Sequence, residues 1–230
     1  MSLDHALYAI EDILGGHCAV ANFAIRALID IATRPRVQTE VRAEIRSVLG
    51  GADFSLADKK SLTYLQATFY ETVRTTCSAI VPHVANRNTS IAGSAERLVR
   101  VVMILFIEGY KVEANTVIWV NNHYANYSED YWDSPKAYIP ERFITEDNSF
   151  KKPKHFQPFS VGKRQCMGYK MVEHVTSFLL ASILAKFEVK CGEAMRKQPL
   201  GQLGLAPKPF YFTVRKTGRS STDSPCRNTA

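Results

Sequence analysis

The cysteines of this sequence form no recognisable pattern, and the missing patterns argue against several classes of protein. The five cysteines are an odd number at scattered positions, with no CxxC pair and no cluster of Cys and His. This pattern disfavours a disulfide framework and a structural zinc site, and it favours a reducing, cytosol-facing setting. The sequence also shows no signal peptide and no apolar run of roughly 18 residues, so we predict no membrane-spanning helix in this chain.

Negative charge is the minority in this chain. It has 29 Lys and Arg against 22 Asp and Glu, for a net charge of +7, and 46% of its 230 residues are hydrophobic. The composition is that of an ordinary globular protein with one large domain or two small ones. Because no nucleic-acid-binding motif accompanies the positive charge, we predict no nucleic-acid partner.

One loop carries the strongest chemical signal. Residues 159–168 read Phe-Ser-Val-Gly-Lys-Arg-Gln-Cys-Met-Gly and precede a helical pattern over 169–186. The N-terminus of a helix stabilises a thiolate through its unpaired N–H groups and its dipole. Arg164 adds positive charge, so we expect the Cys166 thiol to ionise more easily than a free thiol. Gly162 and Gly168 allow a tight turn and the close approach of a flat ligand.

The pattern Phe-x-x-Gly-x-Arg-x-Cys-x-Gly in this loop resembles the haem-binding signature of the cytochrome P-450 superfamily. The resemblance implies a mainly α fold with small β-sheets (α+β), of which this chain is the C-terminal, haem-binding half only. It implies haem b (iron protoporphyrin IX) as cofactor, with Cys166 as the axial ligand of the haem iron. Phe159 would pack beside the sulfur, Arg164 would pair with a haem propionate, and Gly168 would let the ring lie close. Taken alone, Cys166 could also be a buried, inert cysteine.

Apolar residues at helical spacing predict a long, central helix over residues 3–33. Two glycines interrupt it, each at a cost of up to about 1 kcal/mol relative to alanine. In the cytochrome P-450 family the distal helix reads Ala/Gly-Gly-x-Asp/Glu-Thr at the matching place. Here Gly16 fits, but Cys18 and Ala19 replace the acid and the alcohol at these catalytic positions. This replacement argues against conventional hydroxylation and leaves substrate-assisted oxygen activation or rearrangement chemistry open. His17 either faces the pocket or is simply packed or solvated.

Two segments far apart in the chain predict a structural ion-pair triad. Glu71 and Arg74 are three residues apart in a predicted helix over 62–75, so they share one helix face. Alone, such a pair is usually a surface salt bridge worth under about 1 kcal/mol. The later segment Pro-Glu-Arg-Phe at 140–143 resembles the family's partner segment, which implies a triad of Glu71, Arg74 and Arg142. If the triad is buried, removal of one partner should cost several kcal/mol.

The middle of the chain predicts a small sheet with an interruption. Residues 79–84 are expected to be extended, and His83 either contacts a haem propionate, as the resemblance implies, or is an ordinary hydrogen-bonded histidine. Strands are predicted at 88–93 and 110–121, which the family joins directly. We interpret residues 94–109 as a non-native insert, for example a short intron read in frame; a genuine surface loop or a membrane-contacting helix is the alternative.

The last third of the chain predicts a helix and a hairpin. A helix is expected at 171–186, followed by strands at 187–190 and 210–214, and Ser, Thr, Arg and Pro dominate after them. We therefore predict that residues 1–216 form the C-terminal portion of a cytochrome P-450 domain. Residues 217–230 are predicted to be a disordered tail.

The resemblance implies a haem-thiolate oxidoreductase of the monooxygenase type, using O₂ and electrons from NADPH-cytochrome P-450 reductase or another donor. Segments 15–20, 80–85 and 155–160 look most like insect ecdysteroid-synthesising members of the Spook type, which implies a small apolar substrate, a sterol or ecdysteroid precursor. A full-length parent would sit on the cytosolic face of the endoplasmic reticulum membrane, with mitochondria as the alternative, through an N-terminal anchor that this chain lacks. Cations around the Cys166 loop form either a solvated face or a docking patch for an acidic electron donor: Lys151, Lys152, Lys154, Lys163, Arg164 and Lys170.

Two other interpretations compete with this one. The chain could be a truncated, non-catalytic fragment that cannot assemble the full haem and substrate site. A hydrolase with Cys166 as nucleophile and His155 or His174 as base is the third, and it explains neither the Glu71–Arg74 pair nor the 140–143 segment.

Overall fold

The structure of the protein is a computed structural model that describes residues 2–76, 83–84, 89–90, 111–112, 116–119, 121–162, 165–192 and 211–217. The proposed insert at 94–109 and the tail beyond residue 217 lie outside these described residues. The chain divides into two compact units, one made of residues 1–66 and 174–230 and the other of residues 67–173. Each unit is built around its own set of elements.

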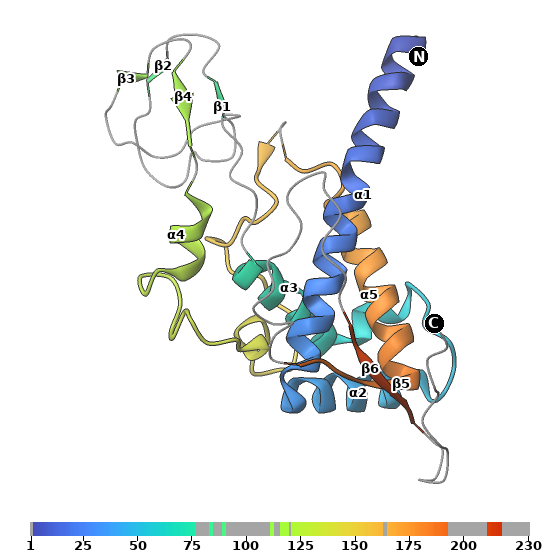
Figure 1. Ribbon diagram of the computed structural model, residues 1–230. Coiled ribbons are helices and arrows are strands. Elements are labelled where there is room, and N and C mark those ends of the chain that lie inside the picture. Colours follow the sequence, from blue (N-terminus) through green and yellow to red (C-terminus); the bar gives the residue numbers. More distant parts are fainter. Residues whose placement is uncertain are drawn as a thin grey trace. The chain divides into compact units, whose positions relative to one another are not determined.

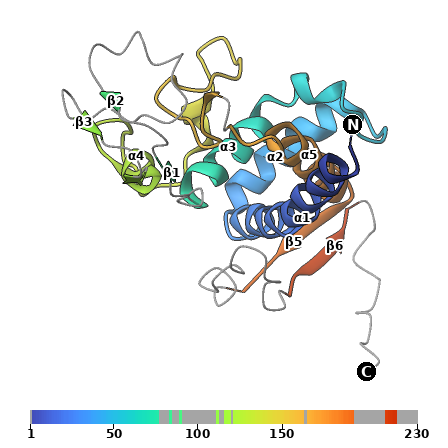
Figure 2. The same ribbon diagram turned by 90° about the horizontal axis from the view of Figure 1, so that it is seen from above.

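The first unit is mainly helical. It contains α1 (Leu3–Ala32), α2 (Pro35–Leu49), the short η1 (Asp58–Ser61), most of α5 (Tyr169–Lys186) and a hairpin of β5 (Phe187–Lys190) with β6 (Thr213–Lys216). Local signals set the helix ends. Ser2 caps α1 by accepting a hydrogen bond from the His5 N–H, Pro35 starts α2, and Gly50 ends α2 with a positive φ of 56°. α1 contacts α2 and β5, and the hairpin lies along α1 (Figure 2).

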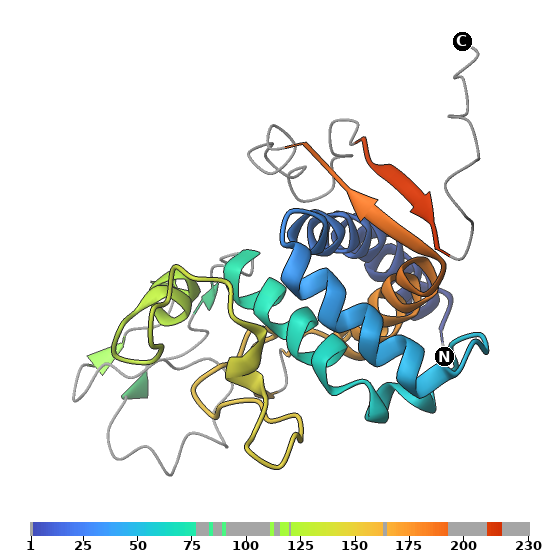
Figure 3. The ribbon, with the colours of Figure 1, turned by 90° about the horizontal axis from the view of Figure 1, so that it is seen from below.

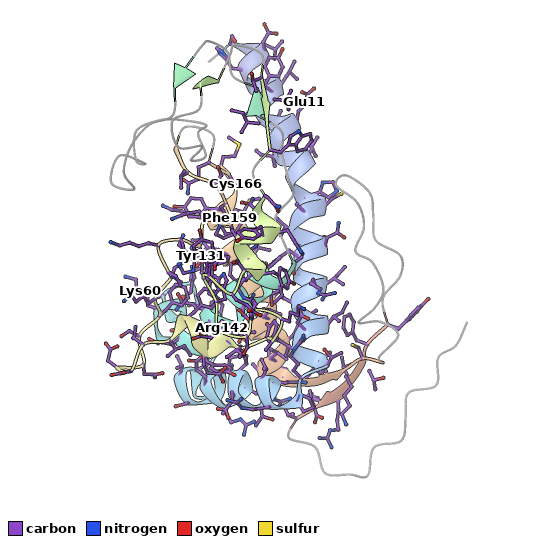
Figure 4. The ribbon with its side chains drawn as sticks, turned by 90° about the vertical axis from the view of Figure 1, so that its left-hand side faces the viewer. Glu11, Lys60, Tyr131, Arg142, Phe159 and Cys166 are labelled. Atoms are coloured by element: carbon purple, nitrogen blue, oxygen red, sulfur yellow. The ribbon has the colours of Figure 1, made fainter. Side chains whose placement is uncertain are left out.

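Helix α1 is buried along its C-terminal half only. Ile29 and Ile31 are fully buried, whereas the apolar side chains of the N-terminal half are at least half exposed: Leu3, Leu7, Tyr8, Ile10, Ile13 and Leu14. This half extends beyond the other helices of its unit (Figure 1), and Glu11 lies on it (Figure 4). The predicted helix over 3–33 is confirmed, but its central burial is confirmed only in part.

The expectation of no membrane-spanning helix stays a prediction. Within the described residues, α1 is long and apolar enough to cross a membrane by length and composition alone. Helices in the core of soluble proteins meet the same criterion, so this finding does not by itself place α1 in a membrane.

The hairpin closes the first unit and is joined to α2 through a side chain. β5 and β6 are antiparallel, with Phe187 opposite Lys216 and Lys190 opposite Thr213. The second strand runs to Lys216 rather than ending at 214, and Thr217 donates two further hydrogen bonds to the Lys186 carbonyl. The buried Gln38 of α2 donates to the Val189 carbonyl at 2.8 Å and accepts from the Val189 N–H at 2.7 Å. The side-chain amide of Gln38 thus makes the two hydrogen bonds to β5 that the backbone of a neighbouring strand would make.

The second unit contains most of α3 (Thr63–Thr76), α4 (Asn122–Tyr127), η3 (Pro140–Phe143) and four two-residue strands. β1 (His83–Val84) pairs with β4 (Val117–Ile118), and β2 (Thr89–Ser90) pairs with β3 (Lys111–Val112), both antiparallel. The predicted pairing of the two sheet segments is present. The single strand predicted over 110–121 is instead two strands, β3 and β4, that pair with different partners.

Aromatic rings form the core of the second unit. The rings of Tyr70, Trp132, Phe143, Phe150 and Phe156 lie with centroids 5.0–6.4 Å apart where they meet. Phe143 and Phe156 are almost completely buried. Aromatic pairs in edge and offset contacts add about 0.5–1.5 kcal/mol each beyond their burial. This core fixes the segment 132–156 that leads to the Cys166 loop.

Candidate functional site

The Cys166 loop is held by backbone hydrogen bonds directly before α5. The Cys166 N–H donates to the Phe159 carbonyl at 2.9 Å, and the Val172 N–H donates to the Gly168 carbonyl at 2.9 Å in the first turn of the helix. Ser160 and Gly162 have positive φ values of 65° and 76°, which turn the chain sharply between Phe159 and Cys166. Figure 4 shows Cys166 and Phe159 close together in this unit.

The thiol of Cys166 is free and exposed, so it is not the buried, inert cysteine that the sequence left open. The apolar side chains of Val161, Met167 and Met171 are also exposed, which leaves the thiol in an open apolar setting. Phe159 is half-buried, and its ring lies 6.1 Å from that of Tyr169.

The donor set around Cys166 fits a haem rather than a chelated metal ion. No group of three His, Cys, Asp or Glu side chains in the described part of the chain could hold a metal. A single thiolate is what an axial ligand supplies when the porphyrin provides the other iron ligands. A Cβ at Gly168 would meet nothing within 4 Å, so packing within the described residues does not require the glycine there.

Two of the expected cofactor contacts fall outside this description. Arg164 lies outside the described residues, and so does Lys163. The backbone of His83 is in β1, opposite Ile118, but its side chain is outside the described part. Propionate binding by Arg164 and His83 therefore stays a prediction.

The structure brings the three residues of the predicted triad together. Glu71 and Arg74 are fully buried, with Arg74 Nη2 2.7 Å from Glu71 Oε1 and Arg74 Nε 2.8 Å from Glu71 Oε2. Arg142 Nε lies 3.5 Å from Glu71 Oε1. The pair is bidentate, which is the strong geometry for a guanidinium and a carboxylate.

Arg74 uses all five of its N–H donors. Beyond Glu71 it donates to the carbonyls of Asn126, Pro135 and Ala137 at 2.7, 2.7 and 3.0 Å. Glu71 Oε1 also accepts from the Ile139 N–H at 2.8 Å. No sequence signal points to these carbonyl partners, because every residue has a carbonyl. Together they tie α3 to the segment 126–139.

Arg142 also holds the segment 126–139 through hydrogen bonds. It donates to the carbonyls of Asp133, Ser134 and Ala137. Tyr138 adds a further tie, since its hydroxyl lies 2.8 Å from that of Thr72 and donates to the Thr68 carbonyl at 3.1 Å. The triad is thus the centre of a hydrogen-bonded brace within the second unit.

The expected distal positions lie on α1, in the first unit. Gly16 and Cys18 are half-buried, and Ala19 is exposed. A Cβ at Gly16 would meet nothing within 4 Å, so packing does not require the glycine there. His17 is exposed; one ring nitrogen contacts the Leu14 carbonyl, and the other lies 3.2 Å from Cys18 Sγ.

Several cations near the loop are exposed in the second unit. Lys151, Lys152, Lys154 and Lys170 all face solvent. The Lys170 ammonium group lies 5.8 Å from the centre of the Tyr169 ring, within reach of a cation–π contact. These side chains are free to meet an acidic surface.

Comparison with known proteins identifies the fold and the family. The chain is 28% identical to cytochrome P-450 307a1 of Drosophila melanogaster over 213 residues, covering 82% of this chain and 36% of that protein. It is 30% identical to human cytochrome P-450 1B1 over 232 residues, covering 97% of this chain and 39% of that protein. The chain thus spans under two fifths of the length of these relatives.

A solved zebrafish cytochrome P-450 with abiraterone has a TM-score of 0.68, with 24% identity, over 87% of this chain and 45% of that one. This likeness shows that the chain has the corresponding part of the P-450 fold, mainly helical with small antiparallel sheets. The family model for cytochrome P-450 matches residues 2–214, so α1 lies inside the family domain. The chain therefore belongs to the cytochrome P-450 family, whose cofactor is haem.

Proposed function

We propose that this chain provides the haem-binding part of a haem-thiolate monooxygenase. The observation that carries the proposal is the free, exposed thiol of Cys166, held by backbone hydrogen bonds just before α5. The first turn of an 18-residue helix favours negative charge through its unpaired N–H groups and its dipole. Cys166 would ligate the iron as a thiolate.

The residues around Cys166 would seat the cofactor, for which we propose haem b. Phe159 would pack beside the sulfur and Gly168 would let the ring approach the backbone, while Arg164 and His83 would bind the propionates. Bound haem supplies the activation of O₂, which the protein side chains cannot perform. The triad of Glu71, Arg74 and Arg142 would have a structural role, because it fixes the segment that precedes the loop.

Proton delivery on the distal side must differ from the usual arrangement. Gly16, Cys18 and Ala19 offer neither a carboxylate nor a hydroxyl group. We infer that protons come from the substrate itself or from solvent, or that the reaction is a rearrangement.

The substrate we propose is a small apolar molecule, a sterol or ecdysteroid precursor. The Spook-type likeness of residues 15–20, 80–85 and 155–160 supports it, and cytochrome P-450 307a1 of Drosophila melanogaster is among the similar proteins. NADPH-cytochrome P-450 reductase, or another donor, would supply electrons at the exposed lysines near the loop. The full-length parent would work at the cytosolic face of the endoplasmic reticulum membrane.

A non-catalytic chain is the second candidate. The exposed apolar side chains on the N-terminal half of α1 favour it, because such a surface is normally covered in a working enzyme. In this case the chain would fold without assembling a complete haem and substrate site.

A reduced, CO-treated absorption spectrum of the full chain with added haem separates the candidates. We expect a thiolate-type Soret band that is lost in Cys166→Ser and kept in Cys191→Ser, a matched change at another cysteine of the chain. A wild-type chain that never shows the band would support the non-catalytic candidate. A band that persists in Cys166→Ser would exclude Cys166 as the ligand.

A further inference from the structure

A cationic pocket in the first unit is lined by residues from the C-terminal parts of α2 and α5; Figure 3 shows the ribbons of these two helices. It has a volume of about 100 Å³ and an apolar floor formed by Ile45, Leu49 and Leu184. A single water needs about 10–15 Å³ on this measure, so the pocket has room for a small oxyanion with its first waters. Three cations line it: Arg42, Arg46 and Lys186.

Arg42 is the unusual member of this set. It is only 9% exposed, and its Nη1 has no hydrogen-bond partner in the described part of the chain. A buried donor without a partner costs about 1–3 kcal/mol, and more when the group is charged. Burial, followed by the neighbouring Arg46, lowers the pKa of Arg42, whereas Glu188 raises it. The Nη1 donor of Arg42 is thus buried without a partner, and the side chain would have to turn for this atom to bond a ligand in the pocket.

The other cations do not supply that partner. Arg42 and Arg46 are four residues apart on α2, a spacing at which like charges repel. Neither forms an ion pair with a carboxylate among the described residues, and Glu188 is engaged by Arg215 and Lys190. Lys186 is 3.0 Å from Asp53, and both groups are exposed. The pocket therefore holds more positive charge than its own carboxylates balance.

Helix dipoles account for only part of this charge. Arg46 is in the last turn of α2 and Lys186 in the last turn of α5, where cations meet free carbonyl groups. Each helix end contributes about half a negative charge, so two ends and Asp53 do not neutralise three cations. Arg42 lies a turn further from the end and is buried, so the dipole does not explain it.

We propose that this pocket binds a phosphate group, with Arg42 and Arg46 as the principal ligands and Lys186 as a third cation. Guanidinium groups suit phosphate because each can donate two parallel N–H bonds to its oxygens. The same chemistry occurs in a soluble phosphate ester and in a phospholipid headgroup, and the apolar floor would accept a short hydrocarbon portion of either. None of the residues that line the pocket belongs to the Cys166 loop, so the proposal does not depend on haem binding.

The test uses the full chain and two probes. Thermal unfolding in sodium phosphate is compared with unfolding in sodium chloride of equal ionic strength, and sedimentation is measured with vesicles of phosphatidylcholine alone or with phosphatidic acid. We expect phosphate to raise the unfolding temperature of the wild type, and binding to weaken about tenfold in Arg46→Gln, as the loss of a charge-assisted hydrogen bond predicts. Arg36→Gln, at the exposed start of the same helix, removes the same charge and should bind phosphate as the wild type does.

The outcomes show whether the pocket binds a soluble phosphate ester, a lipid headgroup or neither. Stabilisation by free phosphate without sedimentation indicates a soluble phosphate ester, whereas sedimentation with phosphatidic acid vesicles that Arg46→Gln abolishes indicates a lipid headgroup. Equal weakening in Arg46→Gln and Arg36→Gln would show a general charge effect and overturn the proposal. No response to either probe would also overturn it. Because Arg42→Gln could unfold the chain, Arg46→Gln and Lys186→Gln, both at exposed positions, carry the test.

Discussion

Replacement of Arg74 by lysine separates the geometry of the buried ion pair from its charge. Arg74 donates five hydrogen bonds, two to Glu71 and three to backbone carbonyls in the segment 126–137. Lysine keeps the positive charge but has only three donors on one nitrogen atom. At least two of the five hydrogen bonds must therefore be lost in Arg74→Lys.

The expected loss of stability follows from those two bonds. A hydrogen bond to a charged group contributes about 1.5–3 kcal/mol, so we expect Arg74→Lys to lower the free energy of unfolding by at least about 3 kcal/mol. The disruption of a buried ion pair costs about 3–5 kcal/mol when one partner is removed outright, which gives a similar upper range. Domains are stable by about 5–15 kcal/mol, so the variant should remain folded at low temperature.

Urea unfolding followed by tryptophan fluorescence measures this loss. Trp132 is a suitable probe because it is buried and its ring centre lies 5.2 Å from the Arg74 guanidinium carbon. With a urea dependence of about 1–3 kcal/mol/M, a loss of 3 kcal/mol lowers the midpoint by about 1–3 M. The exposed Arg36→Lys is the matched control and should change stability by less than about 0.5 kcal/mol. Equal midpoints for Arg74→Lys and the wild type would refute the view that the guanidinium geometry holds this segment.

Three further predictions concern other parts of the chain. Burial raises the pKa of Glu44, although its carboxylate accepts hydrogen bonds from two backbone N–H groups. The contribution of Glu44 to stability is therefore fully present below its unfolded-state pKa and is lost as pH rises through its folded-state pKa. Glu44→Gln should show a smaller loss of unfolding free energy between about pH 4 and pH 7. Gln38→Leu should lower the free energy of unfolding by about 1–3 kcal/mol and speed hydrogen exchange at the Val189 N–H. Unchanged slow exchange at this N–H would show that the bond to Gln38 is unimportant. If residues 94–109 are a non-native insert, such as a short intron read in frame, mature transcripts should lack those 16 codons, and mature transcripts that contain them would disprove it.

Local signals in the sequence predicted the helices well. The helices predicted over 3–33, 62–75 and 171–186 lie within a few residues of α1, α3 and α5. The i, i+3 spacing likewise placed Glu71 and Arg74 on one face of α3. These features depend on neighbours in the sequence, which a single chain contains.

Features that depend on distant backbone could not be predicted in this way. The carbonyls that accept from Arg74 differ from other carbonyls only in the folded chain. The exposure of Leu7 and Ile10 also escaped prediction, because apolar periodicity shows that a face exists but not what covers it. The cationic pocket could not be predicted from the sequence either, because Arg42 and Lys186 are far apart in the chain.

The contact between Gln38 and Val189 bears on how copies of this chain meet one another. An open strand edge invites a strand from another molecule, and this is a common first step towards fibres. In β5 the free edge at Val189 is already occupied by an amide group of the same chain. Self-association by strand addition is therefore blocked at this point, although the hairpin has only two strands.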